Sequence, residues 1–320
     1  MIRDDDRASL GGTRSRTAAE APVTRQLSDV VGHLLPTTQV GSYPRPHWNH
    51  FDLGGEDIRV ALRRADFAEA FADGVRAMIG DQVDAGIDLP TDGHLWYDRH
   101  DGVISSFLLY PAEHLDGIAV VPETSTVMTG FGDQTVAAFG NTWNEVVVTG
   151  EIGRGTMHLA QLWRAARAVS PRTVKFCSGM GPANLGGWLT DHICHLGSGV
   201  PVGVTPYGGF HEMVARDLQV DAVEYAFAET GFPEDDFALW SKYPSEKGLG
   251  IGVIDIKKLV VESPEQIVAG VRRALAHVPP ERIHLTTDCG QFALPRQIAR
   301  GKLAAMAEAA RILRAEIGEG

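Results

Sequence analysis

Four side chains of the kinds that bind soft metal ions fall in three separate segments of the chain. His192 and Cys194 stand two residues apart, Glu224 follows, and Cys289 comes near the end. In an extended segment residues i and i+2 point to the same face, so His192 and Cys194 can converge on one ion, whereas a helix would turn them about 200° apart. Zinc takes thiolate and imidazole ligands, accepts a carboxylate and prefers tetrahedral geometry. The four residues therefore form a chemically suitable shell for zinc.

A purely structural interpretation of the same residues stays open. Free cysteine is among the most frequently buried residue types, so two cysteines and a histidine also occur together as ordinary core residues. The third cysteine, Cys177, lies in the apolar run Val174–Ser178 and is expected to belong to the core. Residue types alone favour this structural interpretation over a zinc site.

The elements that must position these residues alternate along the chain. After residue 36, short apolar runs alternate with helical patterns, which is typical of βα units around a parallel sheet. The strand candidates that end in polar or glycine-rich residues are Thr37–Ser42, Ile87–Asp92, Val146–Gly150, Val174–Ser178, Val200–Thr205, Ala222–Phe227, Gly250–Ile256 and Ile283–Asp288. We therefore predict an α/β fold, a (β/α)8 TIM-like barrel. Such barrels place their sites at the carboxyl ends of the strands.

Three helices between the strands are clear in the sequence. Phe67–Val83 carries apolar residues at helical spacing, as does the stretch from Leu303 to Ile317. Ser263-Pro264-Glu265-Gln266 supplies an N-cap, a proline at the first helical position and a glutamine that can close a capping box. Their apolar stripes are expected to form core.

Composition limits the classes of function. The chain has 320 residues, 44% of them hydrophobic, and a formal net charge of −12, so it can bury a large core and repels nucleic acids and anionic membranes. Three cysteines are too few for a disulfide framework, and no apolar run approaches the roughly 20 residues that span a bilayer, which together indicate a cytoplasmic protein. We expect residues 1–36 to form a flexible arm and residues 37–320 a single barrel.

Several parts of the chain carry a resemblance to known families. The segment from Val220 to Arg314 resembles the end of the catalytic barrel of cobalamin-independent methionine synthases, through Lys242-Tyr243-Pro244, Gly252-Val253-Ile254-Asp255-Ile256, Pro279-Pro280-Glu281-Arg282 and Asp288-Cys289-Gly290. Thr37 to Pro46, with its Gly41-Ser42-Tyr43-Pro44 core, looks like the opening strand of that family, and Asp92-Gly93 looks like the second strand end. His192-Ile193-Cys194 is similar to a segment of short single-barrel relatives, among them the epoxyalkane:coenzyme M transferases.

The resemblance implies a zinc enzyme that transfers a methyl or alkyl group to a thiol, as in methionine biosynthesis. It places the zinc ligands on His192, Cys194, Glu224 and Cys289, although ungapped counting lands on Ala226 in place of Glu224, and Glu229 is within reach of a loop shift. It also places Gly41 and Ser42 where the family binds the carboxylate of the acceptor, and exposed backbone N–H groups suit an anion. A tight turn before Pro44 explains the same two residues equally well.

Two departures from the family pattern bear on the substrate and on the fold. His94 stands where the family has a glutamate that holds the ammonium of the acceptor, so we expect an acceptor other than homocysteine. Residues 174–221 are too few for complete fourth and fifth βα units, and we expect a shortened wall between Gly181 and Gly209.

The remaining candidates are acids and an aromatic side chain. Asp255, Asp92 and His94 are candidate proton donors to a poor leaving group, and Trp96 is a candidate to stack on a flat donor beside His94. The expected partners are a small thiol acceptor and a methyl or alkyl donor, and a homo-oligomer stays open. Two other functions also remain open: a metal-free lyase like uroporphyrinogen decarboxylase, and a barrel that is non-catalytic or needs a partner.

Overall fold

The computed structural model describes residues 26–50, 53, 55–96, 106–121, 145–177, 210–217, 220–292 and 294–318. Within these ranges the chain is a mixed α/β structure. The predicted strand Val200–Thr205 and the predicted short wall between Gly181 and Gly209 lie outside the described residues, as do His192 and Cys194.

A parallel three-stranded sheet forms the C-terminal part. Its strands are β3 (Ala222–Ala226), β4 (Gly248–Gly252) and β5 (Ile283–Thr286), in that order, and residue 224 lies opposite 250, which lies opposite 284. Helices α8 (Glu234–Lys242) and α9 (Pro264–Leu275) link the strands, and α10 (Arg296–Ile317) follows β5. All residues of β4 and β5 are buried, as expected for parallel strands covered on both faces.

Single parallel bridges extend this sheet into an arc. Thr37 pairs with Leu285 and Thr38 with Leu89, while Thr91 pairs with Lys175. The described parallel segments therefore run in space from β3 through β4 and β5 to residues 37–42, then 89–93, then 175. The side chain of Lys175 pairs with Glu224 of β3, so the two ends of the arc are joined by a side-chain contact.

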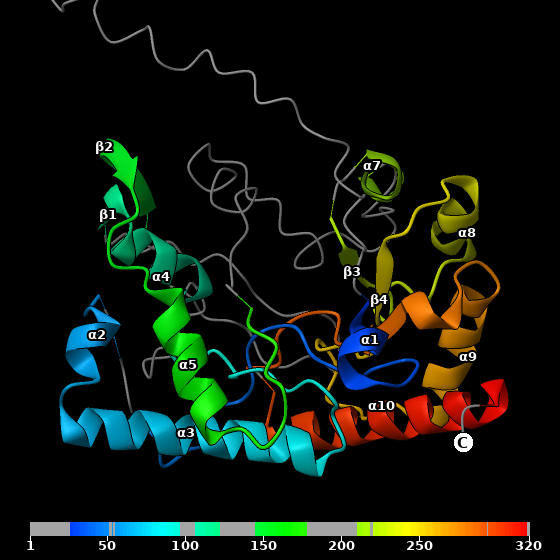
Figure 1. The fold of residues 1–320 in the computed structure, drawn as a ribbon, viewed down its shortest axis with the longest axis horizontal. Coiled ribbons are helices and arrows are strands. Elements are labelled where there is room, and N and C mark those ends of the chain that lie inside the picture. The colour runs from blue at the N-terminus through cyan, green and yellow to red at the C-terminus, as the bar shows by residue number, and fades with distance from the viewer. Residues whose placement is uncertain are drawn as a thin grey trace, which may run out of the picture.

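Amphipathic helices cover the sheet. Helix α3 (Ala65–Asp84) buries Phe67, Phe71, Val75, Met78 and Ile79, the stripe expected from sequence. Its C-terminal end contacts α10, where Arg296 pairs with Asp81, and both helices lie along the lower side of the molecule in Figure 1. The predicted capping box of α9 is confirmed, because Ser263 accepts the N–H of Gln266 and Gln266 accepts the N–H of Ser263. Shorter helices are α2 (Ile58–Ala61), α4 (Ser106–His114), α5 (Leu159–Val169) and α7 (Phe210–Asp217), with a 3₁₀ turn η2 (Pro280–Arg282).

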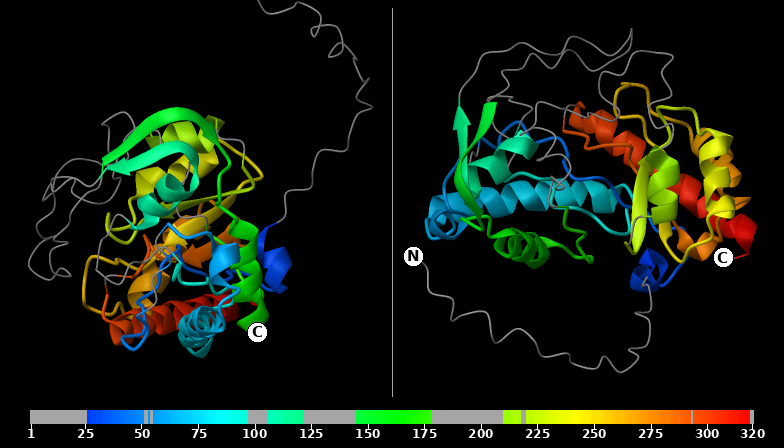
Figure 2. Two further views of the ribbon diagram at one scale, coloured as in Figure 1. Left: turned by 90° about the vertical axis from the view of Figure 1, so that its left-hand side faces the viewer. Right: turned by 90° about the horizontal axis from the view of Figure 1, so that it is seen from above.

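One predicted barrel strand is wrong. Val146–Gly150 belongs to β2 (Glu145–Gly153), which pairs antiparallel with β1 (Asp116–Val121) in a separate hairpin. The hairpin stands at the opposite end of the molecule from β3 and β4 (Figures 1 and 2). Val148 and Ile152 of β2 are 55% and 51% exposed, so the apolar run that suggested a buried strand is instead a solvated one.

The end of the predicted arm is folded. Helix α1 (Leu27–Val31) packs near η2, where Ser28 donates to the carbonyl of Glu281 at 2.6 Å. Leu35 is fully buried, and the carbonyl of Pro36 accepts the N–H of Leu285. Residues 26–36 thus differ from the flexible segment expected there, and residues 1–25 lie outside the described ranges.

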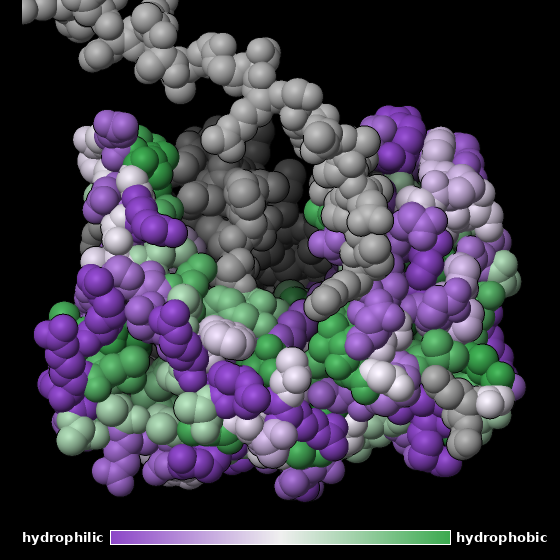
Figure 3. All heavy atoms as spheres, viewed as in Figure 1, coloured by the Kyte–Doolittle hydropathy of each residue, from purple (hydrophilic) through white to green (hydrophobic). Residues whose placement is uncertain are grey.

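The described surface is mostly hydrophilic on the face seen in Figure 3, with small separate apolar patches. Among the described residues, no helix is both long and apolar enough to cross a membrane.

Candidate active site

The carboxyl end of β5 is tied to the loop after β3 by Asp288. Its carboxylate accepts the backbone N–H groups of Phe227 and Ala228 at 3.1 Å and of Glu229 at 2.7 Å. Gly252 leaves the space for this carboxylate, since a Cβ there would lie 2.3 Å from Asp288 Oδ1. Burial raises the pKa of Asp288 well above its usual range, although the N–H donors oppose the shift. Asp288, the residue before Cys289, therefore ties the end of β5 to the end of β3.

Cys289 is held from the other side by the first parallel segment. Thr287 Oγ1 accepts the N–H of Val40 at 3.0 Å and donates to the carbonyl of Cys289 at 2.8 Å. Gly290 fits against Ser42, because a Cβ on Gly290 would lie 2.2 Å from the Ser42 hydroxyl. Cys289 itself is exposed. The surrounding protein nevertheless raises the pKa of its thiol, chiefly by desolvation, so a thiolate there needs a nearby cation.

Glu224 lies one layer deeper than the strand ends. It stands two residues before the end of β3 and at the level of Gly250 and His284. Its Oε1 accepts from Lys175 and lies 3.0 Å from His284 Nε2. Gly250 makes room for the group, because a Cβ there would lie 2.5 Å from both Glu224 and His284.

The charge of Glu224 is set by its neighbours. Burial alone would raise the pKa of this carboxyl, but Lys175 and His284 together hold it at about 2. Lys175 also reaches the carbonyl of Gln39 at 3.4 Å. Glu224 is thus a carboxylate with one oxygen engaged, which is how neighbouring groups usually orient a carboxylate that binds a metal.

The predicted ligands suit zinc chemically, and the structure describes two of the four. Two thiolates, an imidazole and a carboxylate form a suitable zinc donor set. His192 and Cys194 lie outside the described residues, and the described residues alone contain no group of three His, Cys, Asp or Glu that could hold an ion. Ala226, the alternative from ungapped counting, ends β3 and offers no donor, while Glu229 stands in the next loop, paired with Lys257.

Gly41, Ser42 and His94 meet at the end of the first segment. Gly41 has φ +57°, and a Cβ there would lie 2.3 Å from the imidazole of His94, so only glycine allows the ring to pack at this position. Ser42 is largely buried and accepts the N–H of Gln291 at 2.7 Å through its carbonyl. His94 has φ +58°, in the left-handed region.

Asp92, His94 and Trp96 form a buried cluster. The Asp92 carboxyl accepts the N–H of His94 at 3.0 Å and the indole N–H of Trp96 at 2.7 Å. Burial raises the pKa of Asp92 to about 6 and lowers the pKa of His94 to about 3, so His94 is a neutral imidazole near pH 7. Its Nε2 lies 2.8 Å from the carbonyl of Cys177. Trp96 is 2% exposed and stacks on Phe176, which suits a residue that positions Asp92.

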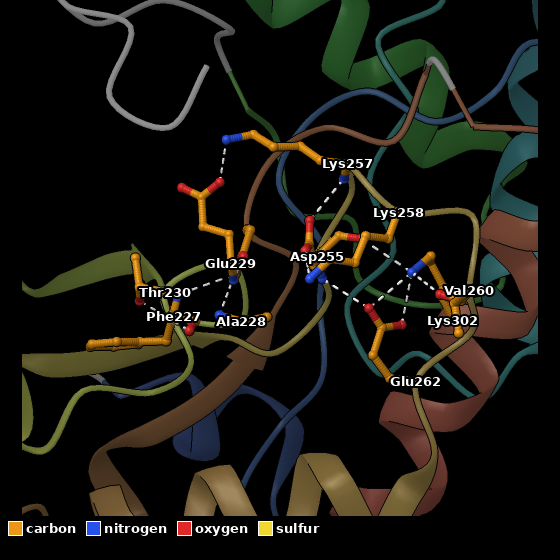
Figure 4. A network of polar contacts seen from close by, with 11 residues as sticks. Phe227, Ala228, Glu229, Thr230, Asp255, Lys257, Lys258, Val260, Glu262 and Lys302 are labelled. Carbon is orange, nitrogen blue, oxygen red and sulfur yellow. Dashed lines mark hydrogen bonds and ion pairs between the residues drawn. The ribbon is translucent and has the colours of Figure 1, made fainter. Parts of the chain in front are cut away.

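Asp255 follows β4 and belongs to a charged network (Figure 4). Its Oδ2 pairs with Lys258 at 2.8 Å and its Oδ1 accepts the N–H of Lys257 at 2.9 Å. It lines a cavity of about 230 Å³ together with Ala228, Phe232, Val253, Lys258, Val260, Glu262, Gln266 and Ile267. A ligand in this cavity can reach the carboxylate.

Sequence reasoning missed the basic residues behind the site. Lys175, His284 and Lys302 are all largely or fully buried and all bind carboxylates. Lys302 carried a usable signal, because it falls between Ala299 and Met306 on the buried face of α10.

Comparison with known proteins places the chain among enzymes. Residues 207–312 match the family model described as cobalamin-independent synthase, catalytic domain. A methionine synthase from Saccharolobus islandicus (strain Y.N.15.51) is 27% identical over 338 residues, covering 89% of this chain and 96% of the relative. Those from Saccharolobus solfataricus and Sulfurisphaera tokodaii are 28% and 26% identical, with similar coverage.

Solved structures agree on the fold. A B12-independent methionine synthase from Shewanella sp. W3-18-1 superposes with a TM-score of 0.60 at 17% identity, over 89% of this chain and 99% of that one. A vitamin-B12-independent methionine synthase from Listeria monocytogenes, described as putative, gives 0.50 at 14% identity, over 88% and 99%.

Proposed function

Because the chain belongs to the cobalamin-independent methionine synthase family, we propose that this transferase moves a methyl or other alkyl group onto the sulfur of a small thiol. The observation that carries the proposal is the position of Cys289. This exposed thiol follows a carboxylate that ties two strand ends together, inside the segment that matches the catalytic-domain model. The proposed fold is a single (β/α)8 barrel over residues 37–320, supported by the parallel arc and by the solved structures.

The proposed metal is zinc, held by His192, Cys194, Glu224 and Cys289. When bound, zinc supplies a cation that keeps an acceptor thiol deprotonated near neutral pH. Lys175 and His284 support this set, because they keep Glu224 ionised and hold one of its oxygens.

Proton supply to the leaving group falls to the acids at the strand ends. Asp255 is the best placed, since it lines the cavity and its backbone is fixed. Asp92 retains a proton near pH 6 but lies beneath the surface, where Trp96 holds it. His94, neutral and buried, is better suited to shape the wall beside Gly41 and Ser42, the proposed carboxylate site of the acceptor.

The metal test compares two cysteines. Wild-type protein is expected to purify with about one zinc per chain and to show thiolate-to-metal charge-transfer bands after cobalt substitution. Cys289→Ser should lose most of the metal, whereas Cys177→Ser, at a cysteine outside the ligand set, should retain it. Zinc-free wild-type protein, or full occupancy in Cys289→Ser, would contradict the metal site and favour the metal-free or partner-dependent alternatives.

The acceptor test uses two thiols that differ by one ammonium group, homocysteine and 4-mercaptobutyrate. Because His94 offers no carboxylate to an ammonium, wild-type protein should not prefer homocysteine. His94→Glu should shift the ratio of kcat/KM values toward homocysteine by about tenfold to a hundredfold, the worth of a charge-assisted hydrogen bond. Efficient homocysteine turnover that His94→Glu leaves unchanged would show that this position does not select the acceptor.

A further inference from the structure

We propose that Lys302 is a positioning residue: it holds the carbonyl of Asp255 directly and the N–H of Asp255 through Glu262, and so aims the Asp255 carboxylate into the site. The role in catalysis rests on the proposed alkyl transfer, while the clamp itself is a property of the fold.

The first step is the burial of Lys302. It lies on α10 with no exposed surface, and its ammonium donates to both oxygens of Glu262 at 2.9 Å, to the carbonyl of Val260 at 2.6 Å and to the carbonyl of Asp255 at 3.1 Å (Figure 4). Burying a lysine is costly unless its charge is paired and its donors are satisfied. All the acceptors come from one loop, residues 253–262, so the position of Lys302 determines the path of that loop.

The second step is the double hold on Asp255. Glu262 Oε1, the oxygen that Lys302 engages, also accepts the backbone N–H of Asp255 at 3.0 Å. The N–H of Asp255 is thus held by Glu262 and its carbonyl by Lys302. With both backbone groups held, the side chain starts from a fixed position, and its carboxylate contacts Lys257 and Lys258 on the side of the cavity.

The third step links the clamp to the strand end that carries Cys289. Lys257, next but one to Asp255, forms an ion pair with Glu229. The backbone N–H of Glu229 donates to Asp288, the residue before Cys289. A continuous chain of contacts therefore joins the interior of α10 to the loops after β3, β4 and β5. Lys302 itself contacts no exposed side chain of the site. Its proposed effect on the site passes through this chain of contacts.

The experiment must separate positioning from simple loss of stability. Lys302→Met alone leaves Glu262 without its counter-charge, so a loss of activity in that variant has two explanations. The pair K302M/E262L replaces both charges by apolar side chains, which often restores stability to a buried ion pair. Arg311→Met, on the same helix but in an exposed pair with Glu308, is the matched control.

Three readouts decide the question. Amide hydrogen exchange is followed over residues 253–262 and unfolding is followed by urea. Methyl transfer is assayed from 5-methyltetrahydropteroyltriglutamate, the methyl donor that the family resemblance implies, to homocysteine and to 4-mercaptobutyrate. In K302M/E262L the amide of Asp255 should exchange about tenfold or more faster, because it has lost its hydrogen bond. The kcat should fall about a hundredfold with the KM for the better thiol acceptor unchanged, since the acid is misplaced while the acceptor site is intact. Arg311→Met should match the wild type.

A stable double variant with wild-type kcat would overturn the positioning role, as would unchanged exchange at Asp255. If K302M/E262L fails to fold, Glu262→Gln keeps the loop polar and still weakens the hold on Asp255. It should then give a smaller shift of the same sign in exchange and kcat, and no shift would overturn the proposal. If wild-type protein transfers no methyl group from this donor to either thiol, the methyl-transfer form of the proposed function fails on its own, and the exchange measurement still accepts or rejects the clamp.

Discussion

The two sides of the site handle buried polar groups in opposite ways. On the side of β3, β4 and β5, charged side chains occur in ion pairs, each with at least one largely buried partner: Lys175 with Glu224, Lys257 with Glu229, Lys258 with Asp255 and Lys302 with Glu262. On the side of residues 37–42 and 89–96, neutral groups form a chain. Gln291 donates to Gln39 at 2.8 Å, Gln39 donates to Thr91 at 2.8 Å, and Thr91 donates to the carbonyl of Gly41 at 2.9 Å.

The difference appears in the pKa values. Desolvation opposes the ionisation of both carboxyls, yet Lys175 and His284 lower the pKa of Glu224 to about 2, while desolvation raises the pKa of Asp92 to about 6. The side with the ion pairs therefore keeps its charges over the whole physiological pH range. It can hold its side chains in a fixed geometry. The neutral side changes protonation under mild conditions. Charge pairing, more than burial, decides which part of the site responds to pH.

The largest expected effect tests the neutral side. The pKa of Asp92 is 3.8 unfolded and about 6 folded, so its contribution to stability is present below pH 4 and lost as the pH rises through 6. The pKa of His94 is 6.5 unfolded and about 3 folded, so its contribution is present above pH 6.5 and lost as the pH falls. Between about pH 4 and 6 each state binds one proton at this pair, and the two slopes cancel.

Single substitutions should uncover the two slopes. With Asp92→Asn, stability should rise with pH by about 1.4 kcal/mol per unit between pH 4 and 6, relative to the wild type. With His94→Asn, which tolerates the left-handed backbone, stability should fall by a similar amount per unit. Urea unfolding at several pH values measures the slopes, and a constant offset from lost hydrogen bonds does not affect them. If the free energy of unfolding of all three proteins changes with pH in the same way, neither pKa is shifted. The effect of Lys175 on His94 would then be the first to reconsider.

The second effect concerns space on the charged side. Gly252→Ala would put a Cβ 2.3 Å from Asp288 Oδ1 and 2.6 Å from the carbonyl of Tyr225, in a buried strand. We expect a loss of about 2 kcal/mol or more in the free energy of unfolding, because Asp288 must leave its three N–H donors or the strands must separate. Gly80→Ala in α3 is the control, since nothing lies within 4 Å of its Cβ. There alanine should stabilise the helix by about 0.5–1 kcal/mol.

If Gly252→Ala leaves the free energy of unfolding unchanged, the hydrogen bonds between Asp288 and the loop after β3 contribute little to stability. Cys289 would then be positioned mainly from the other side, through Thr287 and Ser42. The same variant should also release metal if the zinc proposal holds, since the loops at both strand ends would shift.

Particular residues show how much of the structure could be predicted from the sequence. The strands at 222–227 and 283–288 and the cap of α9 were predictable, because their signals are local: apolar runs with polar ends, and a capping box. Val146–Gly150 was misplaced, because an apolar run of five residues does not reveal whether its partner strand is parallel or antiparallel. The cluster of Lys175, Glu224 and His284 could not be predicted, because it joins three strands far apart in sequence and depends on the missing side chain of Gly250.

The sequence predicted individual residues of the candidate site better than it predicted the contacts between them. Asp255 and Cys289 stand at strand ends as expected. Trp96 was a candidate to stack on a substrate, and in the structure its indole donates to Asp92. An aromatic residue four positions after a buried acid is a signal for such a contact only once the turn between them is known, and here that turn depends on the left-handed backbone of His94.

The smallest expected effect compares two lysines that hold the same loop. Lys258 pairs with Asp255 Oδ2 at 2.8 Å, but its side chain is 56% exposed, whereas that of Lys302 is fully buried. Exposed ion pairs contribute little, so Lys258→Met should change the free energy of unfolding by less than about 0.5 kcal/mol. Lys302→Met, which leaves Glu262 unpaired, should cost about 3 kcal/mol. Because the N–H of Lys257 still holds Asp255 Oδ1, amide exchange at Asp255 should be unchanged in Lys258→Met. Urea unfolding and exchange of both variants, side by side, check the contrast. Equal costs would mean that burial does not separate the two lysines, and that Asp255 is held as much through its side chain as through its backbone.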